Sequence, residues 1–325
     1  MMGAASALAL STAVPRPVRA AREPGRPPRL APGDVVGLIE PAGYTADEAA
    51  LARVRATIEG MGLEPRTGAH VGERFGYLAG TDAERAADIN AMYADEAVRA
   101  VFAIRGGWGS ARILPLLDWE TIRANPKLLI GFSDITALHL AFAAQAGFPT
   151  IHAPNAADSW PQTSWNSLWW LAFAGALPVL GGEGSTIRPG TARGRLLGGN
   201  LSVLCALVGT PWLPDLSGAI LFLEDVGEAE YRIDRMLSQL ALSGILAKAA
   251  GVVFGQCTRC TSGFDDYAGF TIADLMEQYL APLGVPAFHG ANIGHVRGQL
   301  SLPFGCEVEI DAGARTIAVL QSPTA

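Results

Sequence analysis

The chain has 325 residues, half of them apolar and only 17% charged, and at roughly 150 residues per domain this length predicts two domains. The 24 basic and 31 acidic side chains give a net charge of −7, which argues against a protein held on nucleic acid by clustered Lys and Arg. Four cysteines are too few for a disulfide scaffold, and the single CxxC spacing, Cys257 to Cys260, is interpreted as ordinary thiols.

Residues 1–32 differ in composition from the rest of the chain. The range 3–14 is a short apolar run followed by proline and small residues, like the second half of a secretory signal, but no basic region precedes it. It is too short to span a bilayer, which needs ~20 apolar residues. We therefore expect a disordered leader or the remnant of a signal peptide. The protein is expected in the cytoplasm without stable membrane insertion, or in the periplasm if this segment is a signal.

From residue 33 onward, short apolar runs alternate with amphipathic ones. The predicted strands are 35–39, 98–104 and 128–130, and the predicted helices are 47–61, 110–117 and 135–146. This alternation is typical of a parallel sheet covered by helices on both faces. We therefore expect an N-terminal α/β domain at 33–180, with its site beyond the carboxyl ends of the strands.

The second half of the chain has a different pattern. A range rich in Gly, Pro, Ser and Thr predicts a linker at 181–190. The predicted elements that follow are strands at 218–223 and 251–256, a helix at 231–246, and antiparallel strands within 299–321. Residues 191–325 are therefore expected to form a smaller, β-rich α+β domain.

A serine lies between a predicted strand and a predicted helix in Gly131-Phe132-Ser133-Asp134-Ile135. This is the position of a nucleophile in a strand–turn–helix elbow, where the next backbone N–H, that of Asp134, can stabilise an oxyanion. The fifth residue is Ile135 rather than glycine, and Ser133 is equally suited to cap the helix. The residues alone leave both interpretations open.

The glycine-rich turn at 105–109 ends the preceding strand and would lie beside Ser133. Its glycines allow close backbone approach and leave N–H groups free, as an oxyanion hole requires. It has neither the Walker nor the GxGxxG pattern, so no nucleotide cofactor is predicted.

A base and an acid for Ser133 can be sought among few residues. Of the five histidines, His295 stands in a loop beside a glycine, whereas His139 lies in an apolar helix where a core histidine is the default. Glu224 follows the buried run 220–223 and needs a partner there, because a buried charge is costly. That partner is either an imidazole or an arginine of the next helix, Arg232 or Arg235.

These segments together resemble the muramoyl-tetrapeptide LD-carboxypeptidase family. The resemblance runs in order from about residue 33 to 310 and rests on the segments 33–43, 78–82, 105–118, 131–136, 198–211, 223–236 and 294–295. It implies an N-terminal domain similar in fold to class I glutamine amidotransferases, a smaller β-rich C-terminal domain, and a homodimer. Two positions depart from the usual pattern, Glu40 and Ala153, where small residues and glycine respectively are usual.

The resemblance also implies a chemistry and its residues. Carried over by motif, the catalytic triad is Ser133, Glu224 and His295, and the N–H groups of Gly107 and Asp134 form the oxyanion hole. The implied reaction is hydrolysis of the L,D amide bond that releases the terminal D-alanine of peptidoglycan (muramoyl) tetrapeptides through an acyl-enzyme. No metal and no cofactor is required.

Five further residues are candidates for holding the substrate. Arg105 and Arg232, with Arg112, are the arginines expected near the site for a free carboxylate, unless each pairs with a neighbouring acid. Asn200 could bind substrate backbone or occupy a left-handed turn. Trp160 belongs to a group of four tryptophans within 160–170 that forms either an aromatic wall over the site or a packed helix.

Two other functions compete with the first one. The same family includes immunity peptidases of the microcin type, which cleave peptidyl- or aminoacyl-nucleotide amides, and an aromatic loop that holds a base would favour that substrate. A non-catalytic peptide-binding protein of the same fold is the other alternative, although all three triad positions are intact.

Overall fold

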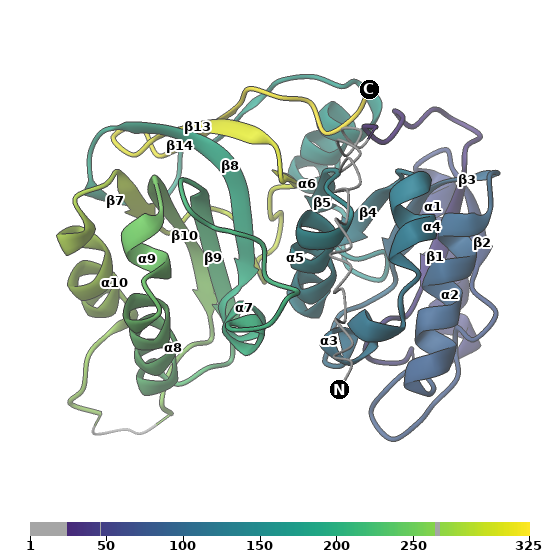
Figure 1. Ribbon diagram of the computed structural model, residues 1–325, viewed down its shortest axis with the longest axis horizontal. Coiled ribbons are helices and arrows are strands. Elements are labelled where there is room, and N and C mark those ends of the chain that lie inside the picture. Colours follow the sequence, from purple (N-terminus) through teal and green to yellow (C-terminus); the bar gives the residue numbers. More distant parts are fainter. Residues whose placement is uncertain (1–24, 46, 264–266) are drawn as a thin grey trace, which may run out of the picture.

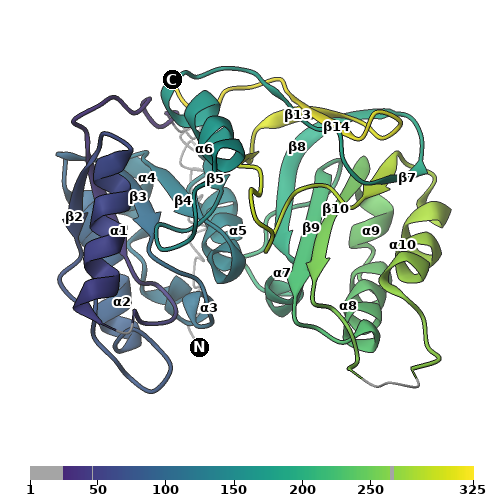
Figure 2. The ribbon, with the colours of Figure 1, turned by 180° about the vertical axis from the view of Figure 1, so that it is seen from behind.

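The computed structural model describes residues 25–45, 47–263 and 267–325. They form two lobes that lie side by side, the N-terminal lobe coloured purple to teal and the C-terminal lobe green to yellow (Figure 1, and from behind in Figure 2). Each lobe is built on one sheet. Residues 1–24 of the predicted leader lie outside the described residues.

The N-terminal sheet has six strands in the order β12-β5-β4-β3-β1-β2. Five are parallel, namely β1 (Val35–Ile39), β2 (Glu64–Thr67), β3 (Val98–Ala103), β4 (Leu128–Gly131) and β5 (Thr150–His152). The sixth, β12 (Leu302–Phe304), pairs antiparallel with β5. Because both faces of β4 are covered, all its side chains are buried, which explains its continuous apolar run.

Six α-helices accompany this sheet: α1 (Glu48–Gly60), α2 (Asp82–Ala94), α3 (Ser110–Ile113), α4 (Trp119–Ala124), α5 (Thr136–Gln145) and α6 (Gln162–Leu168). Local sequence sets their starts. Asp47 accepts a hydrogen bond from Ala50 N–H at the start of α1, and Thr81 and Glu84 form a capping box at the start of α2. Figures 1 and 2, which view the molecule from opposite sides, show α2 in front of one face of the sheet and α1 in front of the other. The predicted doubly covered parallel sheet is therefore confirmed.

The C-terminal sheet has eight strands in the order β6-β14-β13-β8-β9-β10-β11-β7. Its centre is parallel: β8 (Thr191–Asn200), β9 (Ile220–Val226), β10 (Gly251–Thr258) and β11 (Ala287–His289). The antiparallel strands are β6 (Val179–Gly181), β7 (Ser185–Arg188), β13 (Glu307–Asp311) and β14 (Thr316–Val319). The helices are α7 (Leu201–Leu207), α8 (Glu230–Leu242), α9 (Ile245–Lys248) and α10 (Ile272–Leu280).

Four expectations from the sequence change in this structure. The range 181–190 is not a free linker, because it contains β7, whose backbone pairs with β11. The helix predicted to reach residue 246 ends at Leu242, since Gly244 adopts a left-handed conformation there. Residues 25–32 are not a separate leader, since Leu30 is buried and bonds through its N–H to the carbonyl of Ala172. Cys257 and Cys260 form a disulfide rather than free thiols, because the turn after β10 brings their sulfurs together.

Within residues 25–45, 47–263 and 267–325, no helix combines the length with the apolar character that a membrane crossing requires.

A shared aromatic core joins the two lobes. The ring of Phe304 on β12 lies 5.3 Å from His139 of α5 and 6.0 Å from Phe222 of β9, measured between ring centroids. His152 at the end of β5 lies 5.1 Å from the same Phe222. Both histidines are completely buried. The lobes are therefore packed on each other directly, and the ends of β4 and β9 face one interface.

The buried histidines predict how stability depends on pH. Burial lowers the pKa of His139 from 6.5 to about 4 and that of His152 well below 6.5. Below pH 6.5 the unfolded chain therefore binds more protons at these sites than the folded chain, so the free energy of unfolding falls as the pH is lowered. Neither ring nitrogen of His152 has a partner among the described residues, so His152→Leu loses no hydrogen bond.

We compare the unfolding free energy of His152→Leu with that of the wild type. Lowering the pH from 7.5 to 5 should change this difference in favour of the variant by about 2 kcal/mol. Urea titrations of both proteins at the two pH values measure this difference. Replacement of His70 is the control with the opposite sign. Hydrogen bonding to Asp88 raises the pKa of His70, so losing the imidazole lowers the unfolding free energy more at pH 5 than at pH 7.5. An equal difference between His152→Leu and wild type at both pH values would refute the prediction.

Candidate active site

Ser133 lies directly after β4, on the turn that leads into α5. Its φ of 66° is in the left-handed region, which is strained for a residue with a side chain. The cap position of the short 3-10 turn that begins at Ser133 is occupied by Phe132. The interpretation of Ser133 as a helix cap is therefore wrong. Its side chain instead hydrogen-bonds a residue of the other lobe.

That residue is His295, which connects Ser133 to Glu224. His295 Nε2 lies 3.0 Å from Ser133 Oγ, and its Nδ1 lies 2.8 Å from Glu224 Oε2. Glu224 is fully buried on β9 and accepts only, so the network assigns the proton to Nδ1 and leaves Nε2 free to accept the serine hydroxyl proton. The structure therefore brings together the three residues of the predicted triad.

The partner of Glu224 is therefore the imidazole and not an arginine. Arg232 is exposed and pairs with Glu228 at 3.5 Å, and the guanidinium of Arg235 lies over the Tyr231 ring. Gly294, just before His295, has a φ of 100°, and a Cβ there would come 2.5 Å from Glu224 Oε2. Only glycine lets the loop approach the carboxylate this closely.

The glycine-rich turn after β3 lies against the serine. A Cβ on Gly106 would stand 3.0 Å from Ser133 Cβ and 3.2 Å from its Oγ. The buried carboxylate of Asp134 accepts the N–H of Ser110 at 2.8 Å and so ties the elbow to this turn. Burial raises the pKa of Asp134, with that hydrogen bond opposing it. The buried guanidinium of Arg85 holds the turn from the other side through the Gly109 carbonyl, at 3.0 Å.

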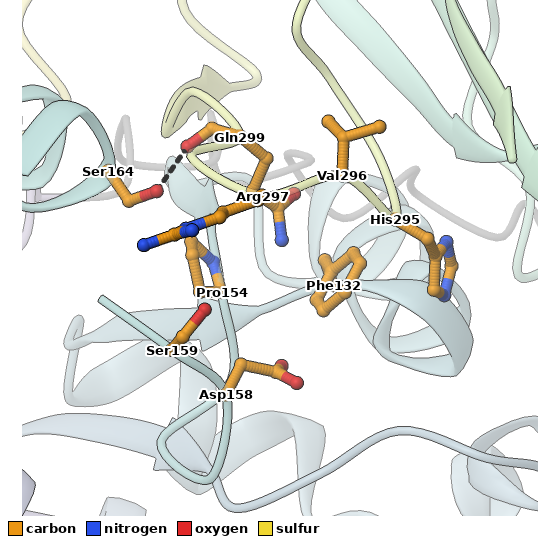
Figure 3. Close-up of a pocket in the computed structure, with 9 residues that line it drawn as sticks. All are labelled: Phe132, Pro154, Asp158, Ser159, Ser164, His295, Val296, Arg297 and Gln299. Carbon is orange, nitrogen blue, oxygen red and sulfur yellow. Dashed lines mark hydrogen bonds between the residues drawn. The ribbon is translucent and has the colours of Figure 1, made fainter. Parts of the chain in front are cut away.

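Three cavities open around this arrangement. The Arg105 cavity, about 430 Å³, is lined by Thr45, Ala50, Arg105, Gly106, Gly107, Phe132, Ser133, Asn155, Ala157, Asp158 and His295. The Arg297 cavity, about 400 Å³ and drawn in Figure 3, is lined by Phe132, Pro154, Asp158, Ser159, Ser164, His295, Val296, Arg297 and Gln299. The aromatic cavity, about 470 Å³, is lined by Gly43, Tyr44, Tyr77, Arg105, Gly107 and Trp108.

Of the arginines expected near the site, only Arg105 lines these cavities. It belongs to both the Arg105 cavity and the aromatic cavity, and its guanidinium donates to the Tyr44 carbonyl at 2.8 Å. Arg112 instead pairs with Asp82 at 2.9 Å. Arg232 lines none of the three.

Asn200 and Trp160 have structural contacts in place of the expected substrate contacts. Asn200 caps α7 by accepting the N–H of Val203, donates to Asp225 and has a φ of −65°, so it occupies no left-handed turn. The indole N–H of Trp160 donates to the Asn155 carbonyl at 3.2 Å, and its ring packs on the core. Sequence reasoning missed the exposed pair Tyr77 and Trp108, whose ring centroids lie 6.0 Å apart.

Sequence reasoning also passed over several residues beside His295. Phe132, Asp158, Arg297 and Gln299 all line the Arg297 cavity. Phe132 was visible within the serine motif, and its ring lies 4.6 Å from that of His295. The other three belong to no motif, because the cavity exists only where two distant loops meet. In the described ranges, no group of three or more His, Cys, Asp or Glu side chains is arranged to hold a metal ion.

A serine on a strained elbow, a bridging imidazole and a buried carboxylate are the arrangement of serine hydrolases, here on a two-sheet α/β fold. Comparison with known proteins specifies the family. Residues 36–153 match the LD-carboxypeptidase N-terminal domain and residues 193–310 match the LD-carboxypeptidase C-terminal domain. The chain belongs to the LD-carboxypeptidase family.

Individual relatives fall into two groups. The murein tetrapeptide carboxypeptidase of Pseudomonas aeruginosa is 36% identical, over 83% of this chain and 91% of that protein. The crystal structure of muramoyltetrapeptide carboxypeptidase from Oxalobacter formigenes has a TM-score of 0.79 at 28% identity, covering 88% of this chain and 97% of that one. The microcin C7 self-immunity protein MccF of Escherichia coli is 27% identical, over 90% of this chain and 94% of that protein. A structure of a microcin C7 self-immunity protein MccF with aspartyl sulfamoyl adenosine has a TM-score of 0.85 at 23% identity, covering 93% of this chain and 100% of that one.

The contact between Gly106 and Ser133 predicts a cost for any side chain there. Gly106→Ala would push the serine by a few tenths of an ångström, and we expect about a tenfold slower reaction of Ser133 with an aryl fluorophosphonate. Gly60→Ala is the matched control, because a Cβ there meets nothing within 4 Å. Mass spectrometry of the labelled protein gives the rate, and thermal unfolding checks the fold. Equal labelling rates for the two variants would contradict the assigned contact.

Proposed function

We propose that this chain is a serine LD-carboxypeptidase that hydrolyses the amide bond before the terminal D-alanine of muramoyl tetrapeptides. The observation that carries the proposal is the hydrogen-bond chain from Ser133 through His295 to Glu224, which opens into a cavity holding the guanidinium of Arg105. Membership of the LD-carboxypeptidase family supports the reaction type. The murein tetrapeptide carboxypeptidase relative supports the substrate.

The geometry suggests how the reaction proceeds. Ser133 Oγ attacks the carbonyl carbon before D-alanine while His295 Nε2 takes the hydroxyl proton, and Glu224 stabilises the imidazolium through Nδ1–H. The tetrahedral intermediate collapses when His295 gives that proton to the leaving amine, which releases D-alanine and leaves an ester on Ser133. Water, deprotonated by His295, then cleaves the ester and restores the serine.

The oxyanion of the intermediate needs donors that are already in place. The N–H groups of Asp134 and Gly107 have this role in the proposal, each contributing on the order of 3 kcal/mol. The tie from Asp134 to Ser110 supports it, because it holds the elbow and the glycine-rich turn at one spacing before substrate binds.

Arg105 is proposed to bind the terminal carboxylate of the leaving D-alanine. Its guanidinium lines the same cavity as Ser133, and its bond to the Tyr44 carbonyl involves only one of its nitrogens. The remaining donors suit a carboxylate, which accepts two parallel hydrogen bonds from arginine. Among the predicted substrate contacts Asn200, Arg232 and Trp160 have no part in this proposal.

Replacing the nucleophile tests the chemistry. Ser133→Ala is expected to lower D-alanine release from a muramoyl tetrapeptide by about 10⁴-fold or more in kcat. Ser217→Ala, at a surface turn where the hydroxyl bonds Asp215, is the control and should keep full activity. D-Alanine is measured by a coupled oxidase assay. Release at the wild-type rate by Ser133→Ala would rule out the triad.

Replacing the arginine tests carboxylate recognition. Arg105→Gln is expected to reduce kcat/KM for the tetrapeptide by about 10- to 100-fold, because a charge-assisted hydrogen bond is lost. For the same peptide with a terminal carboxamide, kcat/KM should be nearly the same in Arg105→Gln and in the wild type, since this peptide has no charge for Arg105 to bind. Arg112→Gln, whose guanidinium pairs with Asp82, is the control. A carboxamide that suffers the same loss from Arg105→Gln would argue against this role.

A second candidate function is cleavage of an aminoacyl-nucleotide amide. The aromatic cavity favours it, because Tyr44, Tyr77 and Trp108 present rings beside Arg105 that a nucleobase could stack on. A turnover assay with the tetrapeptide and an aspartyl-adenylate amide side by side separates the two functions. A higher kcat/KM for the nucleotide amide would replace the first proposal.

Two consequences of the resemblance belong to the same proposal. A homodimer is expected, and sedimentation equilibrium of the purified protein measures it. Removal of D-alanine from muramoyl peptides is expected to serve the recycling of cell-wall fragments.

A further inference from the structure

The aromatic cavity adjoins the place that the proposed function gives to the leaving residue. Arg105 and Gly107 line both this cavity and the Arg105 cavity, which is also lined by Ser133. In the proposed function Arg105 binds the carboxylate of the leaving residue. The side chain of D-alanine is a single methyl group, so it is too short to fill an aromatic cavity of about 470 Å³. The proposed release of D-alanine therefore leaves this cavity without a role.

The rings of the aromatic cavity present apolar surface to solvent. Tyr77 and Trp108 are both more than half exposed, and their ring centroids lie 6.0 Å apart in an edge-to-face arrangement. Tyr44 also lines the cavity, and the guanidinium of Arg74 lies over its ring at 4.5 Å from the centroid. Single exposed apolar side chains are common on protein surfaces, whereas a group of them around a hollow is typical of a binding site. These rings are therefore suited to cover an apolar group of a ligand.

The loop that carries Tyr77 is fixed at both ends. Glu40, at a position where a small residue is usual in the family, is buried after β1, and its Oε2 accepts the N–H of Gly72 at 2.9 Å. At the other end of the loop, Ala79 N–H donates to the carbonyl of Ala42 at 3.0 Å. Both bonds hold the loop to the segment that follows β1. A wall that is already in place loses little conformational freedom when a ligand binds.

The place of Arg105 indicates what kind of ligand brings a ring to this cavity. An amino acid carries its carboxylate and its side chain on the same carbon atom. A guanidinium that lines both cavities is therefore placed to hold the carboxylate of a leaving residue whose side chain enters the aromatic cavity. In a nucleotide, by contrast, a sugar ring separates the anionic group from the base. The shared arginine favours an amino acid over a nucleobase.

We propose that the aromatic cavity is a specificity subsite for the side chain of the released residue, and that it accepts large aromatic D-amino acids at the end of the tetrapeptide. Tyr77 and Trp108 pack on the aromatic side chain while Arg105 holds the carboxylate. The bond that breaks is the same amide bond, and water again cleaves the ester on Ser133, so the product is an aromatic D-amino acid in place of D-alanine. This inference rests on the proposed function, because it assigns Arg105 to the leaving carboxylate.

The test uses three tetrapeptides that differ only in the last residue, which is D-alanine, D-phenylalanine or L-phenylalanine. We expect the wild-type kcat/KM for release of D-phenylalanine to exceed that for D-alanine by about tenfold or more, because the ring is buried against other rings. The L form exchanges the side chain with the hydrogen on the same carbon and directs it away from the cavity. Its release should therefore be at least about tenfold slower than that of D-phenylalanine. Chromatography of the released amino acids measures all three.

Variants connect the preference to the rings. Tyr77→Ala and Trp108→Ala are each expected to lower the ratio of kcat/KM for D-phenylalanine to that for D-alanine by about fivefold or more. The ratio is used because Trp108 belongs to the glycine-rich turn, and a general loss of turnover cancels in it. Phe75→Ala, in the same loop as Tyr77, and Trp170→Ala are the matched controls and should keep the wild-type ratio. Both side chains are exposed, and neither lines any of the three cavities described above.

The outcomes separate this inference from the function it rests on. If the wild type releases D-alanine with a kcat/KM equal to or above that for D-phenylalanine, the subsite is refuted and the proposed function stands. Equal release of D- and L-phenylalanine, or a ratio that survives both Tyr77→Ala and Trp108→Ala, also refutes the subsite alone. If no peptide is cleaved while an aspartyl-adenylate amide is, the proposed function fails and the subsite with it.

Discussion

The site depends on one hydrogen bond that crosses between the lobes, the contact of Ser133 Oγ with His295 Nε2 at 3.0 Å. The serine belongs to the turn after β4, whereas the histidine follows β11, so the two atoms meet only if both sheets hold a fixed mutual position. The aromatic contacts of Phe304 with His139 and Phe222 provide that position, since β12 crosses to the N-terminal sheet and carries Phe304 between the lobes. Close packing of such a core leaves little room for relative movement.

The same arrangement gives a completely buried carboxyl group a hydrogen-bond partner. Glu224 lies on the central strand β9, where a carboxylate without partners would be strongly disfavoured. The imidazole N–H of His295 supplies one hydrogen bond, and Gly294 allows the loop to come close enough to make it. The cost of burying Glu224 is therefore tied to correct docking of the His295 loop. Stability and the catalytic arrangement depend on the same contact.

His295 lines two cavities. The Arg105 cavity is also lined by Ser133 and Arg105, and the Arg297 cavity by Arg297 and the buried Gln299. The aromatic cavity, adjoining Arg105, offers a third surface.

The sequence by itself predicted most of the central strands and, through a resemblance, the three residues that are proposed to react. Continuous apolar runs predicted β1, β3, β4, β9 and β10, because a strand that is covered on both faces carries apolar side chains on both. The serine elbow was visible as a motif because its glycine, serine and acid are adjacent in the chain. Resemblance to a family then ordered Ser133, Glu224 and His295, which no spacing rule could connect across 162 residues.

Only the tertiary structure decided what depends on contacts between distant segments. It showed that β7 lies within the predicted linker, since an edge strand is defined by its partner β11 rather than by its own composition. It removed Asn200, Arg232 and Trp160 from the site, because each has a local partner that the sequence does not specify. It brought Asp158 and Arg297 to one cavity, although neither belongs to a motif. Side-chain chemistry is set by the residue, whereas its use is set by neighbours that only folding supplies.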